Sequence, residues 1–116
     1  IATVACMIAS FGFLAVALGA FGAHALKGTL QTNGTTAVWE TAVLYHFIHA
    51  VVLLVLATQP EASRATSSLF VAGIMLFSGS LYLLALTNAK WLGAITPLGG
   101  LCFLAGWFCL AVWPPR

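Results

Sequence analysis

Charged residues are scarce in this sequence of 116 residues. Only four basic and two acidic side chains are present, 5% of the chain, whereas a soluble domain carries about 25% charged residues. With 62% hydrophobic residues and a mean hydropathy of +1.09, the composition excludes a soluble fold. The charges are scattered singly, so the chain has no basic stripe of the kind that follows a phosphate backbone. We therefore expect no nucleic-acid partner.

Signatures of catalysis and of metal binding are also missing. We find no serine or cysteine nucleophile motif and no glycine-rich phosphate loop in a suitable context. No carboxylate lies in the middle of a hydrophobic run, where a small proton-coupled exporter needs a titrating acid. Cys6, Cys102 and Cys109 all lie inside such runs, where a thiol is ordinarily a small apolar group. We expect a protein that is not an enzyme, with no cofactor and no metal site.

Long uncharged runs, in contrast, are abundant. Four of them approach or exceed the roughly 20 residues that cross about 30 Å of hydrocarbon as a helix: 1–26, 41–58, 65–89 and 91–113. They predict an all-α fold, an integral membrane four-helix transmembrane bundle with antiparallel up-down-up-down order. Residues 1–116 form a single transmembrane domain in this interpretation, and its helices cover about 2–25, 37–58, 65–88 and 91–113.

The second hydrophobic run carries polar side chains at helical spacing. At about 100° per residue, its tyrosine and both of its histidines fall on one arc roughly 120° wide. A ring N–H or phenolic O–H that faced lipid would lack a hydrogen-bond partner, so this arc is predicted to face the other helices. A serine and a tyrosine share a face of the third predicted helix. We name these residues the polar cluster and take them as candidate functional residues: Tyr45, His46, His49, Ser78 and Tyr82.

Two interpretations of the histidines stay open. His46 and His49 have an i, i+3 spacing that permits a metal or haem site, but one helix supplies only two of the ligands that a metal centre needs. The third histidine, His24, lies at the loop end of its helix, whereas His46 lies about 10 Å or more deeper at 1.5 Å per residue. We therefore favour an interhelical hydrogen-bond cluster with Ser78 or Tyr82.

A second group of polar residues is predicted at one end of the bundle, where two connections meet. The segment 28–36 is rich in turn and cap formers and is expected to be a polar loop, and 88–90 is expected to be a tight turn. Glu40 is expected to pair with a nearby cation, Lys27, Lys90 or His24. We name this group the interfacial cluster: His24, Lys27, Glu40, Asn88 and Lys90.

Small residues and one proline shape the first and fourth predicted helices. The small residues of the first helix fall within an arc of about 100° and would let another helix approach closely: Gly12, Ala15, Gly19, Gly22 and Ala23. Pro97 lies inside the fourth run, and a kink is expected there because proline removes a helical hydrogen bond.

Four blocks of the sequence resemble a known family. They are Phe21–Lys27 (FGAHALK), Trp39–His49 (WETAVLYHFIH), Phe77–Leu86 (FSGSLYLLAL) and Leu92–Trp107 (LGAITPLGGLCFLAGW). Together they look like domain-of-unknown-function family 423, small four-span inner-membrane proteins of bacteria with mitochondrial relatives in eukaryotes. The resemblance implies a four-helix bundle in the bacterial inner membrane, or in the mitochondrial inner membrane for a eukaryotic source, with cytoplasmic termini. It brings no established activity, cofactor or catalytic residue.

Three functional hypotheses follow from these features. The leading one is a non-enzymatic accessory or stabilising subunit in the lipid bilayer, which packs against a larger membrane protein complex or forms a homo-oligomer. The small size, the few charges and the small-residue faces of the chain suggest it. An alternative is a small oligomeric transporter or channel whose polar path is lined by the polar cluster. A second alternative is metal or haem binding by His46 and His49.

Overall fold

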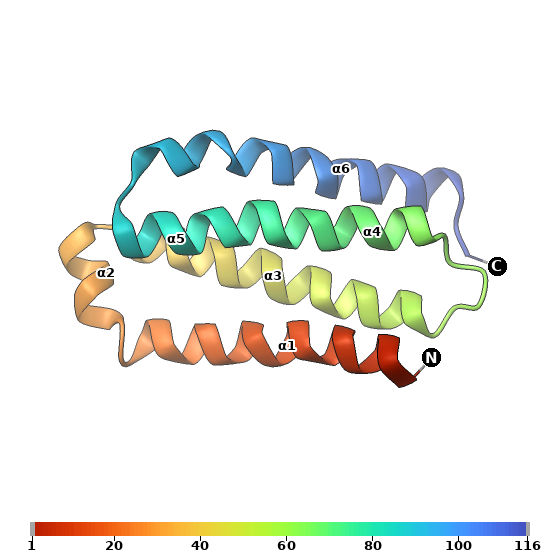
Figure 1. Ribbon diagram of the computed structural model, residues 1–116, viewed down its shortest axis with the longest axis horizontal. Coiled ribbons are helices and arrows are strands. Elements are labelled where there is room, and N and C mark those ends of the chain that lie inside the picture. Colours follow the sequence, from red (N-terminus) through yellow and green to blue (C-terminus); the bar gives the residue numbers. More distant parts are fainter. Residues whose placement is uncertain (1, 116) are drawn as a thin grey trace.

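The computed structural model describes residues 2–115, and every regular element within them is a helix (Figure 1). Four helical segments are long and apolar enough to cross a membrane, with mean hydropathies between 1.8 and 2.3: Val4–Ala23, Thr36–Ala57, Arg64–Thr87 and Lys90–Val112. The all-α transmembrane fold predicted from the hydrophobic runs is therefore confirmed.

The first two segments are continuous and the last two are interrupted. α1 (Ala2–Ala23) and α3 (Thr36–Ala57) are regular α-helices, joined by the short α2 (Lys27–Asn33). The third segment consists of α4 (Arg64–Gly73), a π-helical stretch η1 (Ile74–Ser78) and α5 (Gly79–Thr87). The fourth segment consists of a 3-10 helix η2 (Lys90–Ala94) followed by α6 (Thr96–Val112).

Successive segments run in opposite directions. In Figure 1 both ends of the chain and the connection from α3 to α4 lie at one end of the bundle. α2 and the turn from α5 into the fourth segment lie at the other end. This is the up-down-up-down order expected when short connections join consecutive membrane-crossing helices.

The bundle is flattened, with Cα extents of 48 × 27 × 18 Å. α1 packs mainly against α3, and α6 packs against α4 and η1 on the far side of the molecule (Figure 1). As a result, only 6% of the membrane-crossing part of α1 is buried, compared with 39% for the third segment. α1 is an edge helix with one broad apolar face uncovered.

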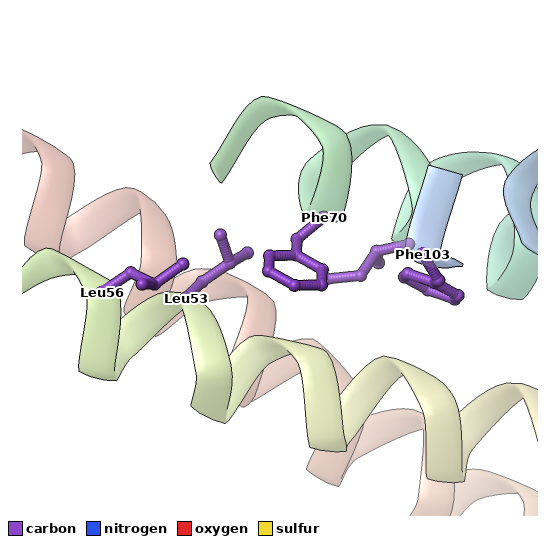
Figure 2. Packing of buried hydrophobic residues seen from close by; sticks show 5 residues of the cluster. Leu53, Leu56, Phe70 and Phe103 are labelled. Carbon is purple, nitrogen blue, oxygen red and sulfur yellow. The ribbon is translucent and has the colours of Figure 1, made fainter. Parts of the chain in front are cut away.

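Two apolar clusters hold the helices together. The larger consists of Leu53, Leu56, Phe70, Ile74 and Phe103, from α3, α4, η1 and α6, and Figure 2 shows the Phe70 and Phe103 rings between these helices. The smaller, at the α2 end, is formed by Leu30, Trp39 and Ala85. In lipid, such contacts stabilise the fold through close packing, because apolar surface gains little by leaving a hydrocarbon solvent.

The segment predicted as a polar loop, 28–36, is mostly helical. Leu30 of α2 is only 1% exposed and anchors the helix on the bundle, which the polar composition of the segment did not indicate. Gly34 ends α2 with a positive φ of 67°, a conformation that suits glycine because it has no Cβ. The Asn33 amide and the Thr35 hydroxyl then donate to the Ala85 carbonyl at 3.0 and 2.7 Å, which joins the α2–α3 corner to α5.

Pro97 does not remove a helical hydrogen bond as predicted, because the proline is at the start of a helix. The fourth segment changes from 3-10 to α-helix at Ile95, and Pro97 lies in the first turn of α6. Backbone N–H groups of a first turn have no partner within the helix, so a proline there removes no hydrogen bond.

The π-helical stretch η1 faces the glycines of α6. A Cβ added at Gly99 would overlap the backbone nitrogen of Phe77, so the two backbones are in direct contact. At the neighbouring Gly100, an added Cβ would be 3.9 Å from the Phe77 ring, an ordinary contact. Gly99 is therefore required for the close approach of α6 to η1.

Candidate functional site

His49 joins α3 to α6. Its side chain is 4% exposed, and the Trp107 indole N–H donates to its Nε2 over 3.0 Å. Because an indole nitrogen can only donate, Nε2 must be the unprotonated acceptor. The ring proton is then on Nδ1, which donates to the Tyr45 carbonyl at 2.7 Å. Both ring nitrogens are satisfied, and the contacts determine the tautomer of the neutral imidazole.

Aromatic rings surround this hydrogen bond. The His49 ring stacks on Phe103 with centroids 3.8 Å apart and an interplanar angle of 9°. Phe70 contacts both the His49 ring, at 5.6 Å, and the Trp107 ring, at 5.4 Å. Tyr45 is 39% exposed and packs against Phe77 at 4.7 Å. The space between α3 and α6 is thus filled by stacked rings.

His46 joins α3 to α5. Its Nδ1 is 2.8 Å from the Tyr82 hydroxyl, and the Tyr82 ring also packs on Trp39 at 4.8 Å. On the opposite side the imidazole meets the ring of Phe11 from α1 edge to face, with centroids 6.3 Å apart. Its Nε2 is buried and has no hydrogen-bond partner within residues 2–115. One imidazole therefore contacts side chains from α1 and α5.

Other polar side chains inside the bundle also bond across helices. The fully buried Ser78 hydroxyl donates to the Ala42 carbonyl at 2.7 Å, which joins η1 to α3. The Trp39 indole N–H donates to the Leu18 carbonyl at 2.9 Å, which joins α3 to α1. An unpaired polar group costs free energy in hydrocarbon, so these bonds favour one particular arrangement of the helices.

The structure divides the polar cluster into two parts. His46 and Tyr82 meet on the α5 side, whereas His49 and Tyr45 lie on the side of α6. Ser78 contacts the α3 backbone and bonds to neither histidine. Within residues 2–115, no three His, Cys, Asp or Glu side chains are grouped closely enough to hold a metal ion.

Sequence reasoning missed Trp107 as a member of the site. The residue lies in a helix that is apolar on all sides, where periodicity does not single out the face that meets α3. The helical period of α6 does not indicate which residue Trp107 contacts. The hydrogen bond from its N–H to His49 follows from the way α6 packs against α3.

The interfacial cluster is not assembled as predicted. Asn88 ends α5 with a left-handed φ of 57°, Lys90 begins η2, and His24 is exposed in the turn after α1. Glu40 is exposed, and no basic side chain in the described part of the chain lies within 4.0 Å of its carboxylate. The expected ion pair is therefore absent from the described residues, although Lys27 and Glu40 both line the groove described below.

The small residues of α1 contact α3 of the same chain. Ala15 is 1% exposed, and a Cβ added at Gly19 would lie 3.3 Å from Val43. A Cβ at Gly22 would overlap the Trp39 indole. At Ala15, Gly19 and Gly22 the close helix approach is thus made within the bundle, whereas Ala23 is exposed and a Cβ added at Gly12 would meet nothing within 4 Å.

Beside this contact lies a groove that we name the α1–α3 groove. One wall is α1 from Ala15 to Ala23, the other is α3 from Thr36 to Phe47, and α2 contributes Lys27 and Gln31 at one end. Its volume is about 830 Å³, within the range of about 300–1,000 Å³ typical of small-molecule sites. Most of its lining is apolar.

Comparison with known proteins connects the chain to membrane proteins of several bacteria. The sequence model of the family described as "Protein of unknown function (DUF423)" matches residues 18–100. UPF0382 membrane protein YwdK of Bacillus subtilis is 47% identical over 105 residues, which cover 85% of each chain. UPF0382 inner membrane protein YgdD of Escherichia coli is 42% identical over 107 residues, 87% of this chain and 80% of the relative. No solved structure matches the chain.

Proposed function

The chain belongs to the DUF423 family of membrane proteins, and on this premise we propose that it is a non-enzymatic accessory subunit that packs against another protein of the inner membrane. The name of the Escherichia coli relative, an inner membrane protein, supports that location. The partner in this proposal is a transmembrane helix of another protein, and the contact is made in the plane of the bilayer.

One observation carries the proposal: the uncovered side of α1. At about 100° per residue, this side lies opposite the contact with α3, and we name it the α1 outer face. Between Cys6 and Ala17 it consists of four small residues around one phenylalanine: Cys6, Ala9, Ser10, Phe13 and Ala17. Small residues let a second helix approach closely in lipid, where van der Waals contact drives helix association. Because only 6% of this span is buried, the other helices of the chain leave its surface free to contact a partner.

The α1 outer face also presents no polar group that would need water. The Ser10 hydroxyl donates to the Cys6 carbonyl of its own helix at 2.9 Å. A hydroxyl satisfied in this way is compatible with either lipid or an apolar partner helix. Phe13, 74% exposed, is the large side chain available to enter a gap on the partner.

The bonding inside the bundle supports the same proposal. His49 has both ring nitrogens bonded, Tyr82 bonds to His46, and Ser78 bonds to the α3 backbone. The bonds of His46 to Tyr82, of Ser78 to Ala42 and of His49 to Trp107 connect helices inside the bundle, and one ring nitrogen of His46 has no partner within residues 2–115. Function by surface packing requires no further chemistry from those residues.

Site-specific photo-cross-linking tests the accessory role. A benzophenone amino acid replaces Phe13 on α1 in one variant and Phe108 on α6 in the control, two phenylalanines that are 74% and 65% exposed. Irradiation of intact cells should give one discrete protein adduct at position 13, and the same partner should copurify with the unmodified chain in mild detergent. Equal adducts at both positions, an adduct of two copies of this chain, or a chain that always purifies alone would contradict the proposal.

A further inference from the structure

The α1–α3 groove has an apolar body and a charged mouth. Its inner part lies between Ala15 and Phe47 in the middle of the spans, and its mouth is at α2, which connects two spans and so lies at the membrane surface. Lys27 and Glu40 both line this mouth, and neither is neutralised by an ion pair within residues 2–115. A molecule that fills the groove must be apolar along its length and polar at one end.

The length of the groove distinguishes a lipid chain from a protein helix. From Thr36 to Phe47, its α3 wall rises about 16 Å at 1.5 Å per residue, which matches one leaflet, half of a hydrocarbon core of about 30 Å. A transmembrane helix would cross both leaflets and continue past the membrane surface, where residues of α2 line the end of the groove. An acyl chain ends at mid-membrane and carries its headgroup at the surface.

The two charges at the mouth define the headgroup. The Lys27 ammonium attracts a phosphate, and the Glu40 carboxylate attracts a cation. A primary ammonium can donate a charge-assisted hydrogen bond to Glu40, whereas the quaternary ammonium of choline has no N–H to donate. A purely anionic headgroup would be attracted by Lys27 and repelled by Glu40.

We propose that the α1–α3 groove binds one phospholipid with a phosphoethanolamine headgroup, its phosphate at Lys27, its ammonium at Glu40 and one acyl chain between α1 and α3. The inference does not rest on the accessory role, which concerns the outer face of α1 from Cys6 to Ala17, whereas the groove wall runs from Ala15 to Ala23. A lipid held in this way would fill the space beside the α1–α3 contact.

Native mass spectrometry of the full chain tests the lipid site. The chain is purified, stripped of lipid in detergent and given equal amounts of phosphatidylethanolamine, phosphatidylcholine and phosphatidylglycerol with identical acyl chains. Glu40→Gln removes the carboxylate, and Ala20→Leu fills the groove with a larger side chain. Ala111→Leu makes the same change at an exposed position of α6 and is the matched control. Circular dichroism melting identifies any variant that fails to fold.

The expected result is about tenfold preferential retention of phosphatidylethanolamine by the wild type, which is typical of one hydrogen bond to a charged group. Glu40→Gln should lower that retention to the phosphatidylcholine level, Ala20→Leu should abolish retention of all three lipids, and Ala111→Leu should behave as the wild type. Equal retention of the three lipids, a preference for phosphatidylglycerol, or a folded Ala20→Leu variant that still retains lipid would overturn the proposal. So would a second copy of the chain that occupies the groove and is released by Ala20→Leu.

Discussion

Removal of the hydrogen bond between Trp107 and His49 is the most stringent test of whether the polar cluster stabilises the bundle. Trp107→Phe keeps an aromatic ring at the position and removes the N–H donor, which leaves the buried His49 Nε2 without its partner. His49→Phe keeps a flat ring that can stack on Phe103 and removes the acceptor. The double variant replaces both partners by apolar rings. A double-mutant cycle over these four proteins isolates the bond from the packing changes of each substitution.

The expected coupling is about 1–1.7 kcal/mol. A buried unsatisfied acceptor costs about 1–3 kcal/mol in soluble proteins, whereas couplings between membrane helices average about 0.6 and reach about 1.7 kcal/mol. The upper part of the membrane range applies because His49 is 4% exposed and stacked against Phe103. The double variant should therefore be more stable than the sum of the single effects predicts.

The assay is reversible unfolding in mixed micelles, followed by circular dichroism as the fraction of denaturing detergent rises. A control cycle pairs His49→Phe with Trp113→Phe, because Trp113 follows α6 and is 68% exposed. That cycle should give a coupling below about 0.5 kcal/mol, as expected for residues without contact. If the Trp107 cycle gives no more than the Trp113 cycle, the hydrogen bond does not hold α6 to α3 and this description of the site is incorrect.

Two further substitutions test other contacts by the same assay. Gly99→Ala should destabilise the fold by about 1–3 kcal/mol, because the new methyl group meets the Phe77 backbone. Gly100→Ala should be neutral or slightly stabilising. Equal effects at the two glycines would contradict the close approach of α6 to η1. Tyr82→Phe should cost about 0.6–1 kcal/mol through loss of the 2.8 Å bond to His46, and an unchanged stability would show that this bond contributes nothing.

Hydrophobic runs and helical periodicity predicted much of this structure. Uncharged runs of about 20 residues predicted four membrane-crossing helices, because backbone groups in lipid are satisfied within a helix. The 3.6-residue period placed Tyr45, His46 and His49 on the inward side of α3. Both histidines are 4% exposed, but the prediction is wrong for Tyr45, which is 39% exposed. These features depend on local sequence and on the solvent that surrounds it.

Contacts between distant residues could not be predicted in the same way. Asn33 and Thr35 look like loop formers, yet they bond to a carbonyl of α5 some 50 residues away. The π-helical stretch η1 contacts α6 closely at Gly99, and its own sequence indicates neither this contact nor the change of helix type. The packing of the helices determines which group each polar side chain bonds to. Periodicity predicts only the face of the helix on which that side chain lies.

The size of the assembly extracted from native membranes tests the proposed role most directly. In mild detergent the 12.1 kDa chain should purify in a larger complex with a second, different protein. Ala9→Trp, which places a large ring on the α1 outer face, should release the chain from that complex, while Leu104→Trp on the exposed side of α6 should leave the complex intact. A wild-type chain that is monomeric under these conditions, or a complex equally sensitive to both substitutions, would contradict the proposal that the α1 outer face binds a partner.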